Sequence, residues 1–208
     1  MLTSGSYLNH FICLDMKRLL VIIVVAFTCN CMMSSFAVNV NYDILLPHPR
    51  LLLAAGGEDG IKRAMADEPA LVKVHDRILG KCRDVLAVEP VKRIKEGKRL
   101  LAVSREALTR IYYLSYAYRM TGDREYAMRA EKEMLAVSEF TDWNPSHFLD
   151  VGEMVMAVAL GYDWLYDELS PETRAMVRRA ILDKGFKPSE DKGSAWFYRS
   201  KTNWNSVC

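Results

Sequence analysis

Four aromatic residues near the end of the chain could bind a carbohydrate. They lie in a stretch without helical period, and they are Trp196, Phe197, Tyr198 and Trp204. Aromatic faces match the C–H faces of pyranose rings, so these side chains suit sugar binding. Aromatic residues in a loop can equally close the rim of a helical domain, and both interpretations stay open here. We take Trp196, Tyr198 and Trp204 as candidate substrate-binding residues.

Carboxyl groups suggest a second kind of chemistry. Asp150 and Glu153 stand three residues apart on a predicted helix, and a pair of carboxyl groups can hydrolyse a glycosidic bond. The alternative is that each pairs with an arginine. The sequence contains no metal-ligand spacing, phosphate loop or nucleophile elbow, so we expect no cofactor and no metal. Four tyrosines on one predicted helix are expected in the core rather than in catalysis: Tyr112, Tyr113, Tyr116 and Tyr118.

The beginning of the chain predicts export. Lys17-Arg18, an apolar run over residues 19–27 and the small residues of Ser35-Phe36-Ala37 form the pattern of a secretory signal peptide. The run is too short to cross a bilayer. Residues 1–37 are therefore assigned to a leader starting at Met16 and an upstream extension, and we expect a periplasmic or extracellular protein. A lipid anchor at Cys29 or Cys31 is a weaker alternative.

Charge and cysteine content exclude other classes of protein. The formal charge of the 208-residue chain is +2, and without the leader 26 basic side chains face 25 acidic ones. No basic run survives that could follow a phosphate backbone, so nucleic acid is not expected as a partner. Cys82 and Cys208 are expected to be buried thiols rather than a disulfide.

The elements that must position these residues are helices of alternating character. Pro47-His48-Pro49-Arg50 excludes a helix at the start of the mature chain. A largely uncharged helix follows, with Ser104 as its predicted N-cap, and Gly122 ends it. Further predicted helices cover Asp123 to Ser138 with one charged face, the segment from Asn144-Pro145 with an enclosed stretch over residues 151–160, and the segment from Ser170-Pro171 with a solvated side.

This order of inner, outer, inner and outer helices is typical of helical hairpins stacked side by side. The predicted fold is all-α, either an open solenoid or an incomplete α/α toroid built from helical hairpins. No 34-residue repeat is visible, which favours the toroid. A toroid of about twelve helices needs roughly 250–350 residues. Residues 38–208 would then hold its N-terminal part, and we expect the domain to continue past Cys208.

Four segments in order resemble heparinase II/III-like and alginate-lyase-like polysaccharide lyases. They are His48-Pro49-Arg50-Leu51-Leu52-Leu53, Phe148-Leu149-Asp150-Val151-Gly152-Glu153-Met154, Gly161-Tyr162-Asp163-Trp164-Leu165-Tyr166 and Thr202-Asn203-Trp204-Asn205-Ser206-Val207-Cys208. The resemblance spans residues 47–208. It implies a secreted enzyme that cleaves uronic-acid-containing glycans by β-elimination, with an acidic polysaccharide as partner and no membrane contact after leader cleavage.

The resemblance also implies site residues. In these lyases an asparagine at the head of an inner helix neutralises the uronate carboxylate, and Asn203 or Asn205 stands in that place. The alternative for both is helix capping. The tyrosine and histidine that act as base and acid in the family are expected beyond Cys208. His147, at the head of the preceding inner helix, is a candidate substrate-binding residue because parallel inner helices bring their heads to one face. A glycoside hydrolase on the same scaffold and a non-catalytic envelope module remain rival functions, and the glycan and oligomeric state stay open.

Overall fold

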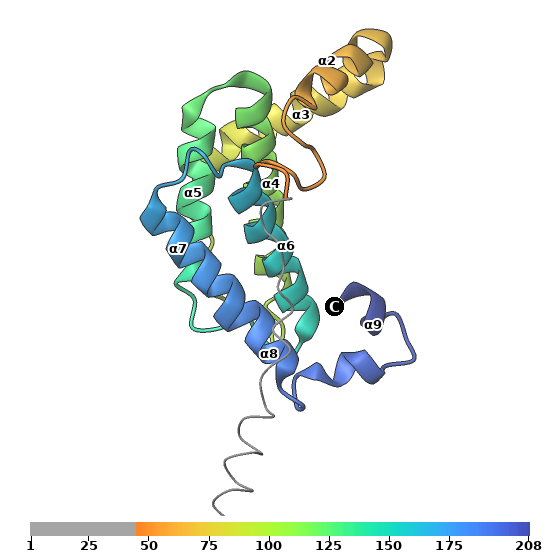
Figure 1. The fold of residues 1–208 in the computed structure, drawn as a ribbon, viewed down its shortest axis with the longest axis vertical. Helices are drawn as coiled ribbons and strands as arrows, with labels where there is room; N and C mark the ends of the chain where they lie inside the picture. The colour runs from red at the N-terminus through yellow and green to blue at the C-terminus, as the bar shows by residue number, and fades with distance from the viewer. Residues whose placement is uncertain (1–44) are drawn as a thin grey trace, which may run out of the picture. The chain divides into compact units, whose positions relative to one another are not determined.

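The computed structural model describes residues 45–208, and these form an all-α fold (Figure 1). The longer helices are α2 (Glu58–Asp67), α3 (Pro69–Leu86), α4 (Leu101–Thr121), α5 (Arg124–Ser138), α6 (Phe148–Trp164) and α7 (Pro171–Ala180). A π-helical turn, η2 (Ile181–Phe186), joins α7 to the short helix α8 (Lys187–Glu190). A 3₁₀ turn, η3 (Ala195–Arg199), and α9 (Trp204–Val207) follow. Among residues 45–208 the only β-type pairing is an isolated bridge between Glu96 and Arg99.

The helices pack as two layers, and α4 and α6 form the inner one. α4 lies along α6, while α5 packs against α4 and α7. The two inner helices run parallel. At one end the backbone N–H of Leu100 donates to Asp150 at 2.6 Å, and at the other the Tyr118 hydroxyl donates to Glu168 at 2.6 Å. The predicted alternation of inner and outer helices agrees with this packing.

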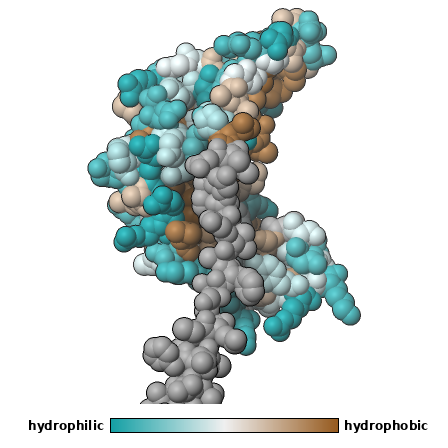
Figure 2. Space-filling view, viewed as in Figure 1, coloured by the Kyte–Doolittle hydropathy of each residue, from teal (hydrophilic) through white to brown (hydrophobic). Residues whose placement is uncertain are grey.

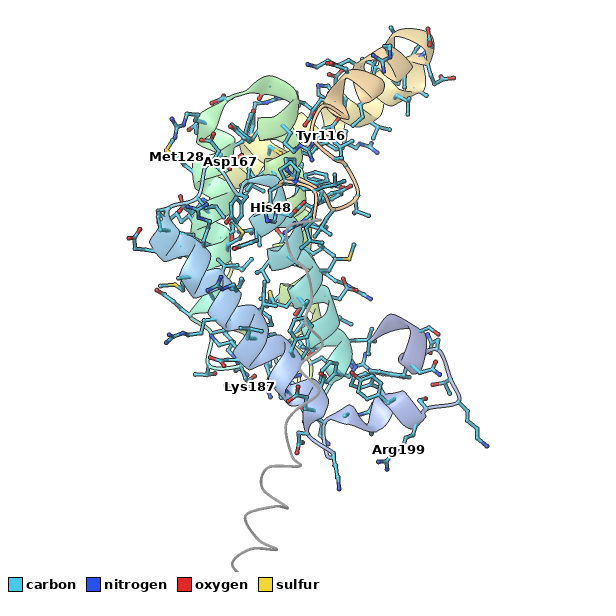
Figure 3. The ribbon with its side chains drawn as sticks, viewed as in Figure 1. His48, Tyr116, Met128, Asp167, Lys187 and Arg199 are labelled. Atoms are coloured by element: carbon cyan, nitrogen blue, oxygen red, sulfur yellow. The ribbon has the colours of Figure 1, made fainter. Side chains whose placement is uncertain are left out.

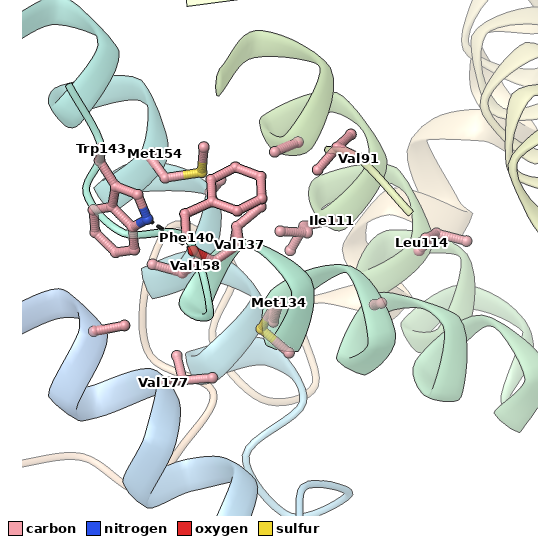
Figure 4. Packing of buried hydrophobic residues seen from close by; sticks show 14 of the residues in the cluster. Val91, Ile111, Leu114, Met134, Val137, Phe140, Trp143, Met154, Val158 and Val177 are labelled. Atoms are coloured by element: carbon pink, nitrogen blue, oxygen red, sulfur yellow. Dashed lines mark hydrogen bonds between the residues drawn. The ribbon is translucent and has the colours of Figure 1, made fainter. Parts of the chain in front are cut away.

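The core lies between α4, α5 and α6 (Figure 4). Ile111, Met134 and Met154 are fully buried there. Gly161 lets α6 approach its neighbours closely, because a Cβ at this position would lie 2.5 Å from Ile111 and 2.6 Å from Met134. Large core side chains from two helices, α4 and α5, thus meet α6 at a position where only glycine fits without a shift.

Local signals for the helix ends are confirmed where they involve turn geometry. Gly122 has a φ of 75°, as a left-handed residue ending a helix requires. The Asp123 carboxylate then accepts the Glu125 N–H at 3.0 Å, and the Ser170 hydroxyl accepts the Thr173 N–H at 3.0 Å with Pro171 at the first helical position. The segment from Pro47 to Arg50 is not helical, as expected.

Two predicted helix starts are wrong. Helix α4 begins at Leu101, so Ser104 lies inside it, fully buried, rather than at the N-cap. Helix α6 begins at Phe148, after His147, and not at Asn144-Pro145. Asn144 adopts a φ of 60° instead, and its side chain donates to the Lys98 carbonyl at 2.8 Å. In both places, contacts with distant segments override the local capping signal.

The predicted charged face of α5 is also partly wrong, because Arg129 and Glu133 are buried. Glu133 accepts from Arg129 at 2.5 Å, from Arg110 at 3.0 Å and from the Val91 N–H at 3.0 Å. The segment between α3 and α4 therefore covers this side of α5. A buried carboxylate is tolerated there because several donors satisfy it.

The two cysteines within residues 45–208 are free thiols, as predicted. Cys82 is fully buried and Cys208 is half-buried. Burial raises the pKa of the Cys82 thiol to about 11. No helix within residues 45–208 has the length and apolar content needed to span a membrane. The predicted signal peptide and the other three cysteines lie outside the described residues.

Candidate carbohydrate site at the heads of the inner helices

The candidate site lies where α6 and α9 begin, beside the start of α4. His147 occupies the N-cap position of α6 and Trp204 is the first residue of α9. Their rings meet edge to face, with centroids 5.2 Å apart. Trp196 from η3 packs on Trp204 at 4.9 Å. The structure thus brings three of the predicted site residues, His147, Trp196 and Trp204, to one place, which we call the inner-helix face.

Asp150 is the buried anchor of this face. Its side chain is fully buried, and it accepts hydrogen bonds from the Leu100 N–H and from the Asn144 amide, both at 2.6 Å. Its other oxygen lies 2.6 Å from Nδ1 of His147. The expected arginine partner is therefore wrong for Asp150, because a backbone N–H, an amide and an imidazole take that place. A carboxylate in the first turn of α6 also meets the positive end of the helix dipole.

The Asp150 contact sets the orientation of the His147 ring. An ionised carboxylate only accepts, so Nδ1 of His147 carries the shared hydrogen. The second ring nitrogen, Nε2, has no protein partner among residues 45–208. A neutral His147 then offers the Nε2 lone pair as an acceptor, while its ring stays fixed by Asp150 and Trp204.

Glu153 has an arginine partner, the alternative to a catalytic role. It accepts from Arg105 at 3.2 Å, which confirms an arginine partner for this residue. Arg105 on α4 has a side chain that is 60% exposed, so a cation stands near the head of α4. With Asp150 buried and saturated and Glu153 paired, these two carboxyl groups do not form an accessible pair.

The other predicted aromatic residues divide between the two roles left open. Phe197 is buried and packs on Phe148 with ring centroids 4.3 Å apart. Tyr198 is 64% exposed and lies against Phe197 at 4.4 Å, and neither His147 nor Trp204 is among its ring contacts. Phe197 thus closes the core, while Tyr198 stands at the surface beside the His147–Trp204–Trp196 group and outside it.

Asn203 and Asn205 are both exposed at the start of α9. Asn203 holds the N-cap position of α9, but its side chain makes no capping hydrogen bond. Asn205 accepts a hydrogen bond from the adjacent Ser206 hydroxyl at 3.3 Å. The helix-capping alternative is therefore wrong for the Asn203 side chain, whose amide can reach a ligand. The structure places both residues next to Trp204 in the chain.

Sequence reasoning missed the loop that supports this face. Asp142 accepts from Arg93 at 2.5 Å and from the Asn144 N–H at 2.7 Å. Burial acts against ionisation of Asp142, but these two donors outweigh it and hold its pKa below the ordinary value. Asn144 then links this loop to Asp150. Asn144 before Pro145 predicts a helix start, but asparagine also tolerates the left-handed conformation that Asn144 adopts here.

A second histidine–aspartate pair lies at the opposite end of α6. His48 Nδ1 donates to Asp163 at 2.5 Å, and its Nε2 accepts from Arg50 at 2.8 Å. The imidazole also stacks on Tyr166 with centroids 4.0 Å apart. Figure 3 shows His48 near Asp167 and Tyr116, at the end away from Lys187 and Arg199. These contacts give His48 a structural role. A third histidine, His75, lies 2.9 Å from the Tyr116 hydroxyl.

A cavity of about 350 Å³ adjoins the second pair, with His48, Asp163, Arg119 and Glu168 in its wall. Most of its charged groups are engaged: Arg119 pairs with Glu58 at 2.5 Å, and Glu168 with Tyr118 and Arg124. Asp167 also lines the cavity and is exposed. Within residues 45–208 no group of His, Cys, Asp and Glu side chains could hold a metal ion.

No protein-family model matches this chain, and no curated protein sequence matches it either.

Proposed function

We propose that this chain is part of a secreted polysaccharide lyase that cleaves uronic-acid-containing glycans by β-elimination. The observation that carries the proposal is the grouping of His147, Trp204 and Trp196 where α6 and α9 begin, with two exposed asparagines on either side of Trp204 in the chain. Aromatic faces for sugar rings and neutral amides for a carboxylate are the groups that such a substrate needs.

The reaction defines what each group does. A base takes the proton from C5 of the uronate, the C5–H electrons form the C4=C5 double bond, and the C4–O bond breaks with a proton returned to the leaving oxygen. Negative charge develops on the uronate carboxylate, so a neutral donor must stabilise it. We assign this role to Asn203 or Asn205.

The remaining residues bind and orient the sugar. Trp204 and Trp196 offer aromatic surface, with Trp196 42% exposed, and the exposed Tyr198 offers a separate ring outside that group. His147 Nε2 accepts a hydrogen bond from a sugar hydroxyl, since Asp150 holds the ring in one orientation. We further propose that the two helical layers belong to an incomplete α/α toroid, because its inner helices must run parallel as α4 and α6 do.

A glycoside hydrolase fits this face less well. It needs two accessible carboxyl groups, whereas Asp150 is fully buried and Glu153 is paired with Arg105. The lyase needs an amide and aromatic surface, and both are exposed here. We therefore favour elimination over hydrolysis.

The test is an absorbance assay of the complete gene product on a panel of uronic-acid polysaccharides. We expect absorbance from the new C=C bond, and its loss in Asn203→Ala or Asn205→Ala but not in the matched control Thr202→Ala, an exposed neighbour whose hydroxyl bonds Ser200 and neither asparagine. Saturated sugars as products would replace the lyase by the hydrolase. No turnover together with no change in tryptophan fluorescence on adding any glycan would overturn the proposal and favour a binding module.

A further inference from the structure

A second hollow in the surface lies between α3 and α4, outside the inner-helix face. Its volume is about 690 Å³. Its lining comes from two helices only: Lys73, Val74, Arg77, Ile78 and Lys81 of α3, and Thr109 and Tyr113 of α4. We call it the α3–α4 groove. None of these residues belongs to the candidate site or contacts it.

The groove carries three cations in a row. Lys73, Arg77 and Lys81 are spaced by four residues, so they share one face of α3 with about 6 Å of axial rise between successive positions. All three are exposed, and none forms a salt bridge or hydrogen bond with another described residue. The groove lining contains no acidic side chain.

The three cations repel one another along α3. Like charges four residues apart on a helix repel by a few tenths of a kcal/mol per pair, and the nearest carboxylates in the chain, Asp76 and Asp84, lie outside the groove lining. Each cation, however, stands free to meet one anionic group of an extended polymer. The charge pattern therefore fits a polyanion that lies along α3.

The floor of the groove favours a sugar polymer over other polyanions. Val74 is 55% exposed, and with Ile78 and the Tyr113 ring it gives an apolar surface for the C–H faces of pyranose rings. Thr109 and Tyr113 bring hydroxyl groups that can pair with sugar hydroxyls. Proteins that bind a single-stranded nucleic acid stack its bases on successive aromatic side chains, whereas the apolar part of this lining is mostly aliphatic and has one ring, Tyr113. In Figure 2, the end of the molecule formed by α2 and α3 has hydrophilic residues on its outer edge and a hydrophobic patch beneath.

We propose that the α3–α4 groove is a second binding site for an acidic polysaccharide, which it holds through carboxylate or sulfate groups. Such a site would keep a long substrate chain on the protein while the inner-helix face engages one part of it, raising the local concentration of substrate. The inference rests on the proposed function only for the identity of the polymer. The charge and shape of the groove are independent of the chemistry at the other site.

The test compares two variants with equal loss of charge. The first is the triple variant Lys73→Gln/Arg77→Gln/Lys81→Gln. The matched control is Lys62→Gln/Arg63→Gln/Lys192→Gln, which removes three exposed cations outside the groove. Binding of fluorescently labelled galacturonate and heparin hexasaccharides is measured by anisotropy, with a neutral dextran as reference and circular dichroism melting to verify folding.

We expect the groove variant to bind the better acidic probe about tenfold more weakly, since three exposed ion pairs are lost. The control should stay within about twofold, and dextran should not bind. Equal weakening by both variants, or undiminished binding by the groove variant, would overturn the site. Tighter, groove-dependent binding of a single-stranded DNA oligonucleotide would overturn the choice of polymer.

The same experiment in a Trp204→Ala background separates the two proposals. Sites that share no residues or partners should act additively, so the groove variant should keep its tenfold effect there. Absence of lyase activity with persistent groove binding would remove the proposed function and leave the groove. Lyase activity with no effect of the groove variant would do the reverse.

Discussion

The two ends of helix α6 each carry a histidine–aspartate pair, and the pairs differ in what surrounds the histidine. At the head of α6, His147 lies 2.6 Å from Asp150, and at its other end His48 lies 2.5 Å from Asp163. Both aspartates are buried, and both histidine side chains are 16% exposed. Distance and burial therefore do not distinguish the pairs.

The two pairs differ in what the second ring nitrogen of the histidine contacts. Nε2 of His48 accepts from Arg50, and Asp163 also accepts the backbone N–H groups of Arg50 and Leu51 at 2.8 Å each. This pair ties the N-terminal segment to α6. Nε2 of His147 has no protein partner within residues 45–208, and Trp204 stands at the edge of its ring. We call the His48–Asp163 pair the clasp, because both ring nitrogens of His48 are bonded and the pair serves structure. The His147–Asp150 pair is a candidate binding group, because Nε2 of His147 is free to accept a hydrogen bond.

The largest effect should come from removing the carboxylate of the clasp. In Asp163→Ala, the imidazole of His48 and two backbone N–H groups lose their acceptor, so we expect a loss of about 3 kcal/mol in the free energy of unfolding. Urea denaturation measures it. The matched control is Asp167→Ala, an exposed aspartate four residues on, which should change stability by less than about 0.5 kcal/mol. Equal small losses in both variants would mean that the clasp does not hold the fold.

Exchanging the two histidines for alanine tests the difference directly. His147→Ala should weaken binding of an acidic hexasaccharide about tenfold, because it removes a hydrogen-bond acceptor and part of the support of Trp204. His48→Ala should lower stability by about 1–2 kcal/mol and leave binding within about twofold. Anisotropy and urea denaturation of both variants give the four values.

The proposed difference between the two pairs is wrong if binding and stability change alike in His147→Ala and His48→Ala. Unchanged binding in His147→Ala would make that pair a second clasp. Weakened binding in His48→Ala, at a temperature where the variant is still folded, would assign a binding role to His48, at the C-terminal end of α6.

The sequence was sufficient for features set by local chemistry. Gly122, Asp123 and Ser170 mark helix ends because a left-handed glycine or a capping side chain acts within a few residues. The alternation of uncharged and charged helices predicted the two layers for the same reason, since each helix shows its buried face in its own periodicity.

Features set by distant segments could not be predicted. Arg129 and Glu133 look like a solvated pair on α5, and they are buried only because the segment before α4 covers them. Asp150 received its partner from Leu100, fifty residues away. In the site, His147 and Trp204 meet with ring centroids 5.2 Å apart, although 57 residues separate them in the chain. Which aromatic side chains of η3 would join them depended on the turn, and it points Trp196 to Trp204 and Phe197 to the core.

The smallest expected effect belongs to Tyr118, at the His48 end, and it depends on pH. Burial, together with the hydrogen bond to Glu168, raises the pKa of Tyr118 to about 12, against about 10 in the unfolded chain. The neutral hydroxyl therefore contributes stability below pH 10, and the contribution is lost as pH rises from 10 through 12. Tyr118→Phe should cost about 1 kcal/mol at pH 8, since Arg124 still pairs with Glu168. Urea denaturation at pH 8 and pH 11 should show this difference shrinking, and a difference that stays constant would mean that the Tyr118–Glu168 hydrogen bond does not favour the neutral hydroxyl.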